Sequence, residues 1–208
     1  ALDKAVQGMF AVANKLYGLH FALTDEVEKY HQEVQTYKVT DAEGNYVALL
    51  YTDFFPRAGK RNGAWMTTFK DQYIDLQGND SRPHISIVCN FTRPTDTEPS
   101  LLTFNELTTL FHEFGHALHG MLSRVTYPSL SGTNVARDFV ELPSQLMENW
   151  CYEEETLRLF ASHYQTGEPL PIEWVQKIKE ASAFMEGILS VRQLNFGFLD
   201  MAWHTYPH

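Results

Sequence analysis

The segment over residues 104–124 constrains this chain most, because it predicts an amphipathic helix that carries two histidines one turn apart. Thr103 and Glu106 form a capping-box pattern at its start, in which each side chain can accept a hydrogen bond from a free helix amide. At about 100° per residue, the apolar side chains gather on one face: Leu107, Leu110, Phe111, Phe114, Leu118, Met121 and Leu122. The three histidines of the segment fall on the opposite face. The pattern therefore predicts a helix with one face in the core and imidazoles on the other.

His112 and His116 lie four residues apart, so their rings stack about 6 Å apart along the helix axis and can meet on one ion. Glu113 lies beside them and completes the H-E-x-x-H arrangement of a zinc peptidase, in which the glutamate acts on metal-bound water. The alternative is a coincidental pair of surface histidines. The helical setting and the flanking apolar residues favour a site for one zinc ion.

A catalytic zinc site uses three protein ligands and leaves the fourth position open. Leu122 stands where a metzincin would place its third histidine, six residues after His116, so we expect a carboxylate instead. Glu141 is the candidate, although most helical glutamates belong to a solvated stripe. A zinc pair that lacks a ligand favours Glu141 as the third one, and with three ligands assigned we expect His119 to be no ligand.

Glu141 belongs to a predicted helix over residues 134–153 with one polar and one apolar face. The apolar face comprises Phe139, Leu142, Leu146 and Trp150. The polar residues that we expect to orient the zinc-binding histidines through their second ring nitrogens are Asp138, Gln145 and Glu148. Pro143 removes one backbone hydrogen bond, so it must lie near the first turn of this helix or kink it.

Composition narrows the class of protein and its partners. The chain has 208 residues, 44% of them apolar, and carries a net charge of −10 with no block of Lys and Arg, which argues against a nucleic-acid partner. No run of 18 apolar residues predicts a membrane span, so we expect no membrane partner. Two cysteines make no disulfide framework, which favours a reducing, cytoplasmic compartment. We expect residues 1–208 to form a single region with one core.

The remaining patterns predict an α+β fold that is predominantly helical, with a small β-sheet packed on a helical zinc-binding core. Helices are expected over residues 2–23, 104–124, 134–153, 154–164 and 172–203. A hairpin is expected over residues 37–51, with its turn at 41–45, and further strands over 64–69 and 84–91. Residues 77–83 are expected to form a loop.

Two long motifs carry a resemblance to a known family. These are His112-Glu-Phe-Gly-His-Ala-Leu-His119 and Arg137-Asp-Phe-Val-Glu-Leu-Pro-Ser-Gln145, with Ser131-Gly-Thr between them and Glu148-Asn-Trp150 after them. Together they resemble the thimet oligopeptidase family of zinc metallopeptidases. Asp53-Phe-Phe-Pro, Gly63-Ala-Trp-Met66 and Val88-Cys-Asn-Phe91 are most similar to its bacterial peptidyl-dipeptidase (Dcp) branch.

The resemblance implies that His112, His116 and Glu141 bind zinc and that Glu113 is the catalytic carboxylate. It also implies that an edge strand around Gly63, Ala64 and Trp65 lies beside the substrate backbone, whereas Trp65 could equally be a core residue. Family members begin with a long helical region and continue into a segment whose Tyr and His donors stabilise the transition state. We therefore expect this chain to be an internal catalytic-core piece with little activity alone.

The sequence thus predicts zinc-dependent hydrolysis of short peptides, with release of C-terminal dipeptides. An endo-acting oligopeptidase shares the same motifs and stays open. A non-catalytic domain, in which zinc holds two helices together or stabilises a peptide-binding surface, is the alternative from another class. Structural zinc sites are usually closed and rich in cysteine, which counts against it.

Overall fold

The structure is a computed structural model that describes residues 1–206. Its contacts divide the chain into two units, residues 1–169 and residues 170–208, and each is described by itself. The first unit contains the sheet and the H-E-x-x-H helix, so it carries every site residue predicted from the sequence. The expectation of a single region over residues 1–208 stays a prediction.

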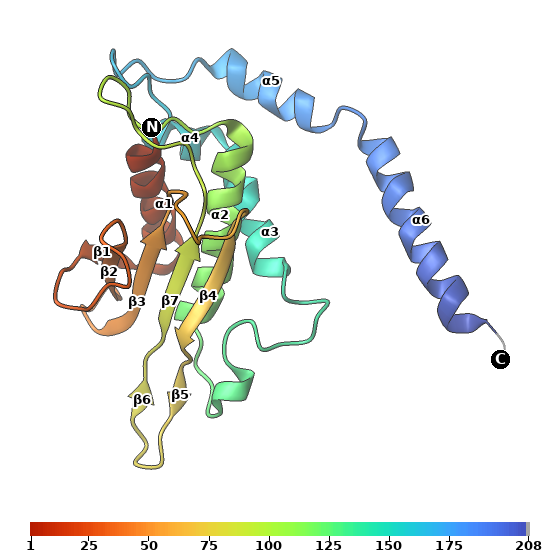
Figure 1. Cartoon of the computed structure of the whole chain (residues 1–208). Helices are drawn as coiled ribbons and strands as arrows, with labels where there is room; N and C mark the ends of the chain where they lie inside the picture. Colours follow the sequence, from red (N-terminus) through yellow and green to blue (C-terminus); the bar gives the residue numbers. More distant parts are fainter. Residues whose placement is uncertain (207–208) are drawn as a thin grey trace. The chain divides into compact units, whose positions relative to one another are not determined.

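Five strands form a mixed sheet in the order β1-β2-β3-β7-β4 (Figure 1). They are β1 (His20–Leu23), β2 (Gln35–Thr40), β3 (Tyr46–Asp53), β7 (His84–Val88) and β4 (Trp65–Lys70). Neighbours pair antiparallel except β3 and β7, which run parallel with Leu50 opposite Ile85. Among residues 1–206, β4 is the last strand of the sheet and pairs only with β7, with Trp65 opposite Val88.

The predicted hairpin is confirmed as β2 and β3. Asp41 builds its turn by accepting hydrogen bonds from the backbone N–H groups of Glu43 and Asn45, at 3.1 and 2.8 Å. Gly44 has a φ of 84°, a conformation that glycine adopts without steric cost. The predicted loop at 77–83 is partly wrong, because β5 (Tyr73–Ile74) and β6 (Asp80–Ser81) form a small second sheet there.

Helices α1 (Leu2–Tyr17) and α2 (Phe104–Met121) pack against the sheet (Figure 1). The ring of Phe10 on α1 lies 6.0 Å from the ring of Phe114 on α2, measured between centroids. The core between them contains the fully buried side chains of Met9, Phe114, Leu50, Ile85 and Ile87. Each such side chain stabilises the fold by about 1.5–3 kcal/mol through apolar burial. The helix predicted over residues 2–23 is too long: Gly18, with a φ of 67°, ends α1 and the chain turns into β1.

The predicted helix over residues 134–153 begins only at α3 (Leu142–Glu148), because Pro143 occupies its first turn. It continues as the 3-10 helix η2 (Asn149–Tyr152), and a separate 3-10 helix, η1 (Pro128–Leu130), precedes it. Its predicted apolar face is wrong: Leu142 and Leu146 are 52% and 53% exposed, whereas Ser144 and Met147 are the buried residues of α3. The helix predicted over 154–164 is α4 (Glu154–Phe160).

The second unit contains α5 (Ile172–Ser182) and α6 (Glu186–Thr205), where the sequence predicts one helix over 172–203. The helix breaks because Met185 adopts a left-handed conformation, with a φ of 61°. Among residues 1–206, no helix has the length and apolar composition that a membrane crossing requires. The α+β, predominantly helical fold with a small sheet is confirmed.

Candidate metal centre

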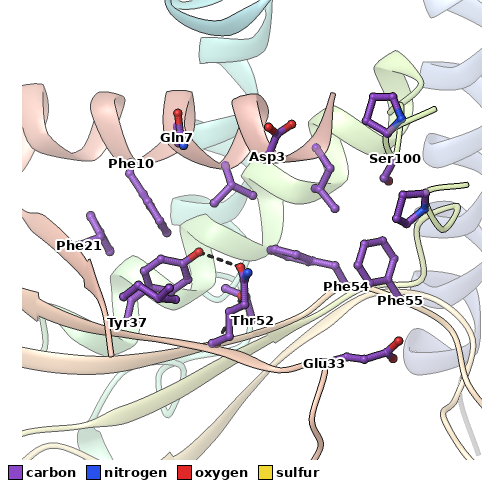
Figure 2. A pocket seen from close by; sticks show the side chains of 16 residues that line it. Asp3, Gln7, Phe10, Phe21, Glu33, Tyr37, Thr52, Phe54, Phe55 and Ser100 are labelled. Atoms are coloured by element: carbon purple, nitrogen blue, oxygen red, sulfur yellow. Dashed lines mark hydrogen bonds between the residues drawn. The ribbon is translucent and has the colours of Figure 1, made fainter. Parts of the chain in front are cut away.

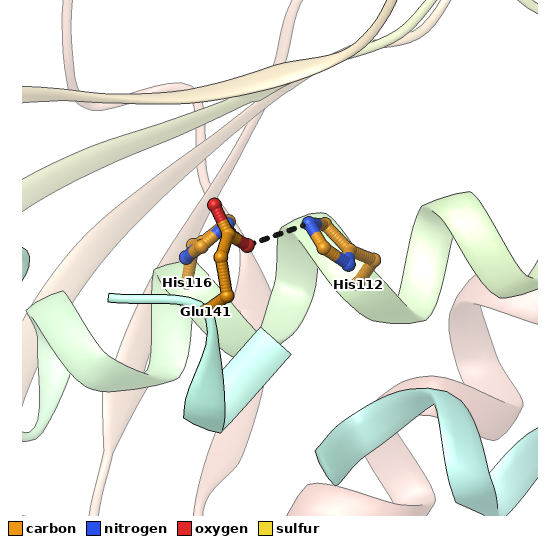
Figure 3. Close-up of side chains that lie close together, drawn as sticks. All are labelled: His112, His116 and Glu141. Carbon is orange, nitrogen blue, oxygen red and sulfur yellow. Dashed lines mark ion pairs between the residues drawn. The ribbon is translucent and has the colours of Figure 1, made fainter. Parts of the chain in front are cut away.

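Three side chains from two parts of the chain converge on one point. α2 supplies His112 and His116, and Glu141 immediately precedes α3. Glu141 Oε2 lies 3.3 Å from His112 Nε2 and 3.1 Å from His116 Nε2, and Figure 3 shows the carboxylate directed at both rings. The sequence predicts this triad, and the structure brings its three members together.

The donor set fits a zinc ion. With metal–ligand bonds of about 2.0–2.1 Å, neighbouring corners of a tetrahedral site lie about 3.3 Å apart. The two measured separations match this spacing. Two imidazole nitrogens and one carboxylate oxygen also form a ligand set used in catalytic zinc sites, which leaves the fourth position open. The geometry alone therefore supports a three-ligand metal site.

The start of α2 is fixed by the predicted capping box, which is confirmed. Thr103 Oγ1 accepts from the Glu106 N–H at 3.2 Å, and the Glu106 carboxylate accepts from the Thr103 N–H at 2.8 Å. Leu110, Phe111 and Phe114 are fully buried on the apolar face of the helix. The position of α2 against the sheet is thus set by its core face, which leaves the histidine face to meet α3 and β4.

Gly115 allows α3 to approach α2 closely enough for Glu141 to reach the histidines. A Cβ at Gly115 would lie 2.5 Å from both Pro143 O and Ser144 Cα, which are backbone atoms of α3. Ser144 Oγ lies 2.9 Å from Glu141 Oε2 and can donate a hydrogen bond to it. This role of Ser144 is missed by the sequence analysis, although its place three residues after Glu141 is a spacing typical of local side-chain hydrogen bonds.

Glu148 is the one predicted outer partner that contacts a histidine. Its Oε1 lies 2.6 Å from His112 Nδ1, so it can orient the ring and fix the tautomer that leaves Nε2 free for a metal. Asp138 and Gln145 are exposed, and within residues 1–206 no hydrogen bond joins either of them to a histidine. His116 Nδ1 is buried, and within residues 1–206 it has no hydrogen-bond partner.

Glu113 is 7% exposed and lies beside the triad. Burial raises the pKa of its carboxyl group; the charge of His112 and the backbone N–H of Met66 act in the opposite direction, and Glu141 adds to the increase. Burial also lowers the pKa of His116, against the effect of Glu141. The environment therefore favours a Glu113 that holds a proton more readily than an exposed glutamate and a His116 that stays neutral.

A pocket of about 400 Å³ joins the triad to the edge strand of the sheet. Its lining comprises Ala64, Trp65, Met66, His112, Glu113, His116, Thr133, Val140 and Glu141. Two of the three predicted substrate-binding residues, Ala64 and Trp65, thus line the pocket, whereas Gly63 lies just outside it. Trp65 is only partly buried. Met66 and Thr133 also line the pocket; the sequence analysis names them only as parts of family motifs and assigns them no role.

Comparison with known proteins shows which family the chain belongs to. The sequence model of peptidase family M3 matches residues 1–208. The chain belongs to peptidase family M3. It is 42% identical to the dipeptidyl carboxypeptidase of Escherichia coli (strain K12), over 95% of this chain and 29% of that protein. It is 41% identical to oligopeptidase A of Salmonella typhimurium, over 98% of this chain and 30% of that protein.

A plant relative shows the same extent of similarity. The probable cytosolic oligopeptidase A of Arabidopsis thaliana is 42% identical, over 99% of this chain and 30% of that protein. The chain therefore spans about 30% of the length of the curated relatives it matches. The resemblance to oligopeptidases and dipeptidyl carboxypeptidases that the motifs predict is confirmed over nearly the whole chain.

A second pocket, of about 590 Å³, lies between α1 and strands β1 to β3 (Figure 2). Aromatic side chains from several elements line it, among them Phe10, Phe21 and Tyr37, with Tyr37 donating a hydrogen bond to Gln35 at 2.9 Å. None of its lining residues belongs to the triad. The predicted zinc ligands and Glu113 line the pocket of about 400 Å³ and not this one.

His119 lies on α2 but outside the triad. Its ring packs edge-on against Phe139, with the ring centroids 5.9 Å apart, and burial lowers its pKa. The expectation that His119 is no ligand stays a prediction.

Proposed function

We propose that this chain carries the catalytic core of a zinc peptidase that hydrolyses short oligopeptides and releases C-terminal dipeptides. The single observation that supports it most is the meeting of His112, His116 and Glu141 beside Glu113, in a pocket that opens along an edge strand. Membership of peptidase family M3 supports peptide hydrolysis by a metallopeptidase. Zinc, the direction of cleavage and the roles of the residues are part of the proposal.

His112 Nε2, His116 Nε2 and Glu141 Oε2 would hold one zinc ion. Zinc bound there supplies a Lewis acid that polarises the scissile carbonyl and lowers the pKa of a water molecule towards about 7. Glu148 keeps His112 oriented for this role, since it holds the other ring nitrogen. The carboxylate of Glu141 balances part of the charge of the ion.

Glu113 acts as the general base and then as the general acid. Its carboxylate takes a proton from the attacking water and delivers that proton to the leaving amine. The burial that raises the pKa of Glu113 suits both steps, because it makes the carboxylate a stronger base than an exposed glutamate. Glu113 lines the pocket together with Met66 of β4, on the side where the substrate would lie.

The substrate is a short peptide that lies along β4. Within the described residues β4 pairs only with β7, so the backbone at Trp65 and at the two residues that lead into β4, Gly63 and Ala64, can add an extended peptide as a further strand. We favour release of dipeptides because one relative at 42% identity is named a dipeptidyl carboxypeptidase. Internal cleavage is the second candidate, since a relative at 41% identity is named oligopeptidase A. No feature of the acidic chain favours a nucleic acid or a membrane as partner.

The 208-residue chain alone should bind zinc and cleave peptides slowly. The lining of the metal pocket, within residues 1–206, contains no tyrosine hydroxyl and no Lys or Arg side chain to stabilise an oxyanion. Loss of such donors typically reduces turnover by about 10²–10³. Cytoplasmic location is likewise a proposal, since the absence of a disulfide framework is its main support.

Glu113→Gln tests the proposal. We expect the variant to bind one zinc ion per chain, like the unchanged protein, and to lose hydrolysis of a fluorogenic peptide, measured in the 208-residue chain and in a longer form of the protein. Glu43→Gln, on the exposed turn between β2 and β3, is the matched control. Failure of the unchanged chain to bind zinc, or full activity of Glu113→Gln, would show that the proposal is wrong. Dipeptide products, identified by mass spectrometry, separate terminal from internal cleavage.

A further inference from the structure

The segment between β3 and β4, residues 54–64, leads directly into the side of the metal pocket. It contains Gly63, which has a φ of 93°, and it ends at Ala64, which lines the pocket together with Trp65, the first residue of β4. Two polar side chains fasten this segment to the end of β7 from different directions. They are Lys60, within the segment, and Asn90, two residues beyond the end of β7.

Lys60 is a buried cation with four oxygen contacts. Its side chain is 3% exposed, and its Nζ donates to Asp53 Oδ1 at 2.9 Å. It also contacts three backbone carbonyl oxygens, of Asp53 at 3.0 Å, Phe55 at 2.8 Å and Cys89 at 2.6 Å. Since these carbonyls belong to the ends of β3 and β7 and to the segment itself, one ammonium group joins all three parts.

Asp53 is the counter-charge of this cluster. Burial by itself would raise the pKa of Asp53, but hydrogen bonds from Arg57, Lys60 and Tyr30 outweigh it and lower the pKa to about 2. Arg57 binds the carboxylate through both terminal nitrogens, at 2.7 and 2.8 Å. The charge of Lys60 is therefore balanced in place, and the start of the segment is fixed to β3.

Asn90 fixes the end of the segment. Its Nδ2 donates to Arg61 O at 2.9 Å and to Gly63 O at 2.7 Å. Both hydrogens of one side-chain amide are thus used on two carbonyls among the three residues that precede the pocket-lining Ala64. The hydrogen bonds of Asn90 therefore hold this segment and not the metal ligands. Those ligands belong to other elements, since they come from α2 and from the residue before α3.

The position of this segment affects where Met66 and the edge of β4 lie. Met66 lines the pocket together with Glu113, and Trp65 pairs with Val88 at the end of β7, two residues before Asn90. A shift of Gly63 would therefore move both the backbone that would receive the peptide and the part of β4 that lines the pocket with Glu113. Neither Lys60 nor Asn90 lines the pocket.

We propose that Asn90 and Lys60 are positioning residues, which hold the backbone of residues 63–66 in the place where it binds the peptide substrate. The kinetic part of this inference rests on the proposed peptidase function, whereas the structural part does not. The two residues act through the backbone and not by touching the substrate, so their loss should weaken peptide binding without weakening metal binding.

Asn90→Asp is the first test, since it keeps the shape of the side chain and replaces the amide donor with a carboxylate that faces two carbonyl oxygens. We expect backbone amides of residues 63–66 to exchange hydrogen about tenfold faster, as the loss of two hydrogen bonds predicts, while α2 exchanges as before. Zinc affinity should stay within twofold. In the metal-loaded protein, KM for a short peptide should rise about tenfold, with a smaller change in kcat.

Asn90→Ala removes the donors without adding a charge and should show the same pattern to a lesser degree. Asn14→Asp is the matched control, because Asn14 Nδ2 donates to the backbone of Leu19 at the end of α1, away from the pocket. Unchanged exchange at residues 63–66 in both Asn90 variants would overturn the inference, and so would an equal effect in Asn14→Asp. An unchanged KM with faster exchange would also overturn it. If the unchanged protein cleaves no peptide, the proposed function fails, and the exchange experiment alone decides the structural part.

Discussion

Gly115 determines how closely α3 approaches α2, so Gly115→Ala should displace the third metal ligand. An alanine Cβ would lie 2.5 Å from Pro143 O and from Ser144 Cα. Both are backbone atoms, so they can move away only if the start of α3 moves. To reach an ordinary contact of 3.4 Å, that backbone must shift by about 0.9 Å. Glu141 lies two residues before Pro143 and moves with it.

The shift is large compared with what a metal site accepts. Bond lengths in such sites hold to about 0.2 Å, whereas Glu141 Oε2 now lies 3.1–3.3 Å from the two Nε2 atoms. Disturbing the support of a ligand typically weakens metal binding by about 10–100-fold, and we expect Gly115→Ala to weaken zinc binding by at least this much. The alanine also favours the helix by about 1 kcal/mol, which offsets part of the cost of the clash to the stability of the metal-free chain.

Zinc affinity is measured by competition with a chromophoric chelator, and stability by urea denaturation of the metal-free chain. Gly120→Ala is the matched control in the same helix, because its Cβ would meet the end of the Ile85 side chain, 2.7 Å away, and a side chain can rotate away. We expect Gly120→Ala to bind zinc normally. If Gly115→Ala also binds zinc normally, the close approach of the two helices does not place Glu141, and the reasoning is refuted.

Three further predictions follow from other contacts. Asp53→Asn should lower the free energy of unfolding by about 3–5 kcal/mol, measured by urea denaturation, because it leaves Lys60 buried without its counter-charge. Since the pKa of Asp53 is lowered to about 2, its contribution should be complete above about pH 4 and lost as pH falls towards 2; an acid-unfolding curve unchanged by Asp53→Asn would contradict this. Glu148→Ala should weaken zinc binding by about 10–100-fold, since His112 loses its orienting partner, and equal affinities in a chelator competition would argue against that role. Thr103→Ala should destabilise the chain by about 0.5–2 kcal/mol through loss of the capping box, seen as a lower urea midpoint.

The sequence by itself determined the parts of this protein that depend on local spacing. The capping box at Thr103 and the apolar stripe of α2 follow from helical geometry, as does the approach of His112 to His116. The turn at Asp41 and the pairing of the strands on either side follow from local hydrogen bonds and from the residue preferences of turns. The carboxylate at position 141 could be selected because a metal site with two histidines requires a third ligand.

Only the tertiary structure decided how the two histidines of α2 meet Glu141, which lies just before α3. Periodicity places Glu141 inside a helix. In the structure α3 begins at Leu142 with Pro143 in its first turn, so Glu141 lies just before the helix. The polar faces on the helical wheel suggest exposure, yet Glu113 and His116 are buried because α3 and β4 cover them. Leu146 is exposed for the opposite reason, since its helix buries another face against α2.

The contacts of the residues that support the metal centre were likewise decided by the tertiary structure. Ser144 contacts Glu141 over a local spacing of three residues, which allows the hydrogen bond but does not require it. Asn90 binds the backbone of Gly63, 27 residues earlier, and this contact depends on the distance between segments that are far apart along the chain. A pattern can therefore name the reactive groups, whereas packing between α2, α3 and β4 decides their distances, burial and pKa.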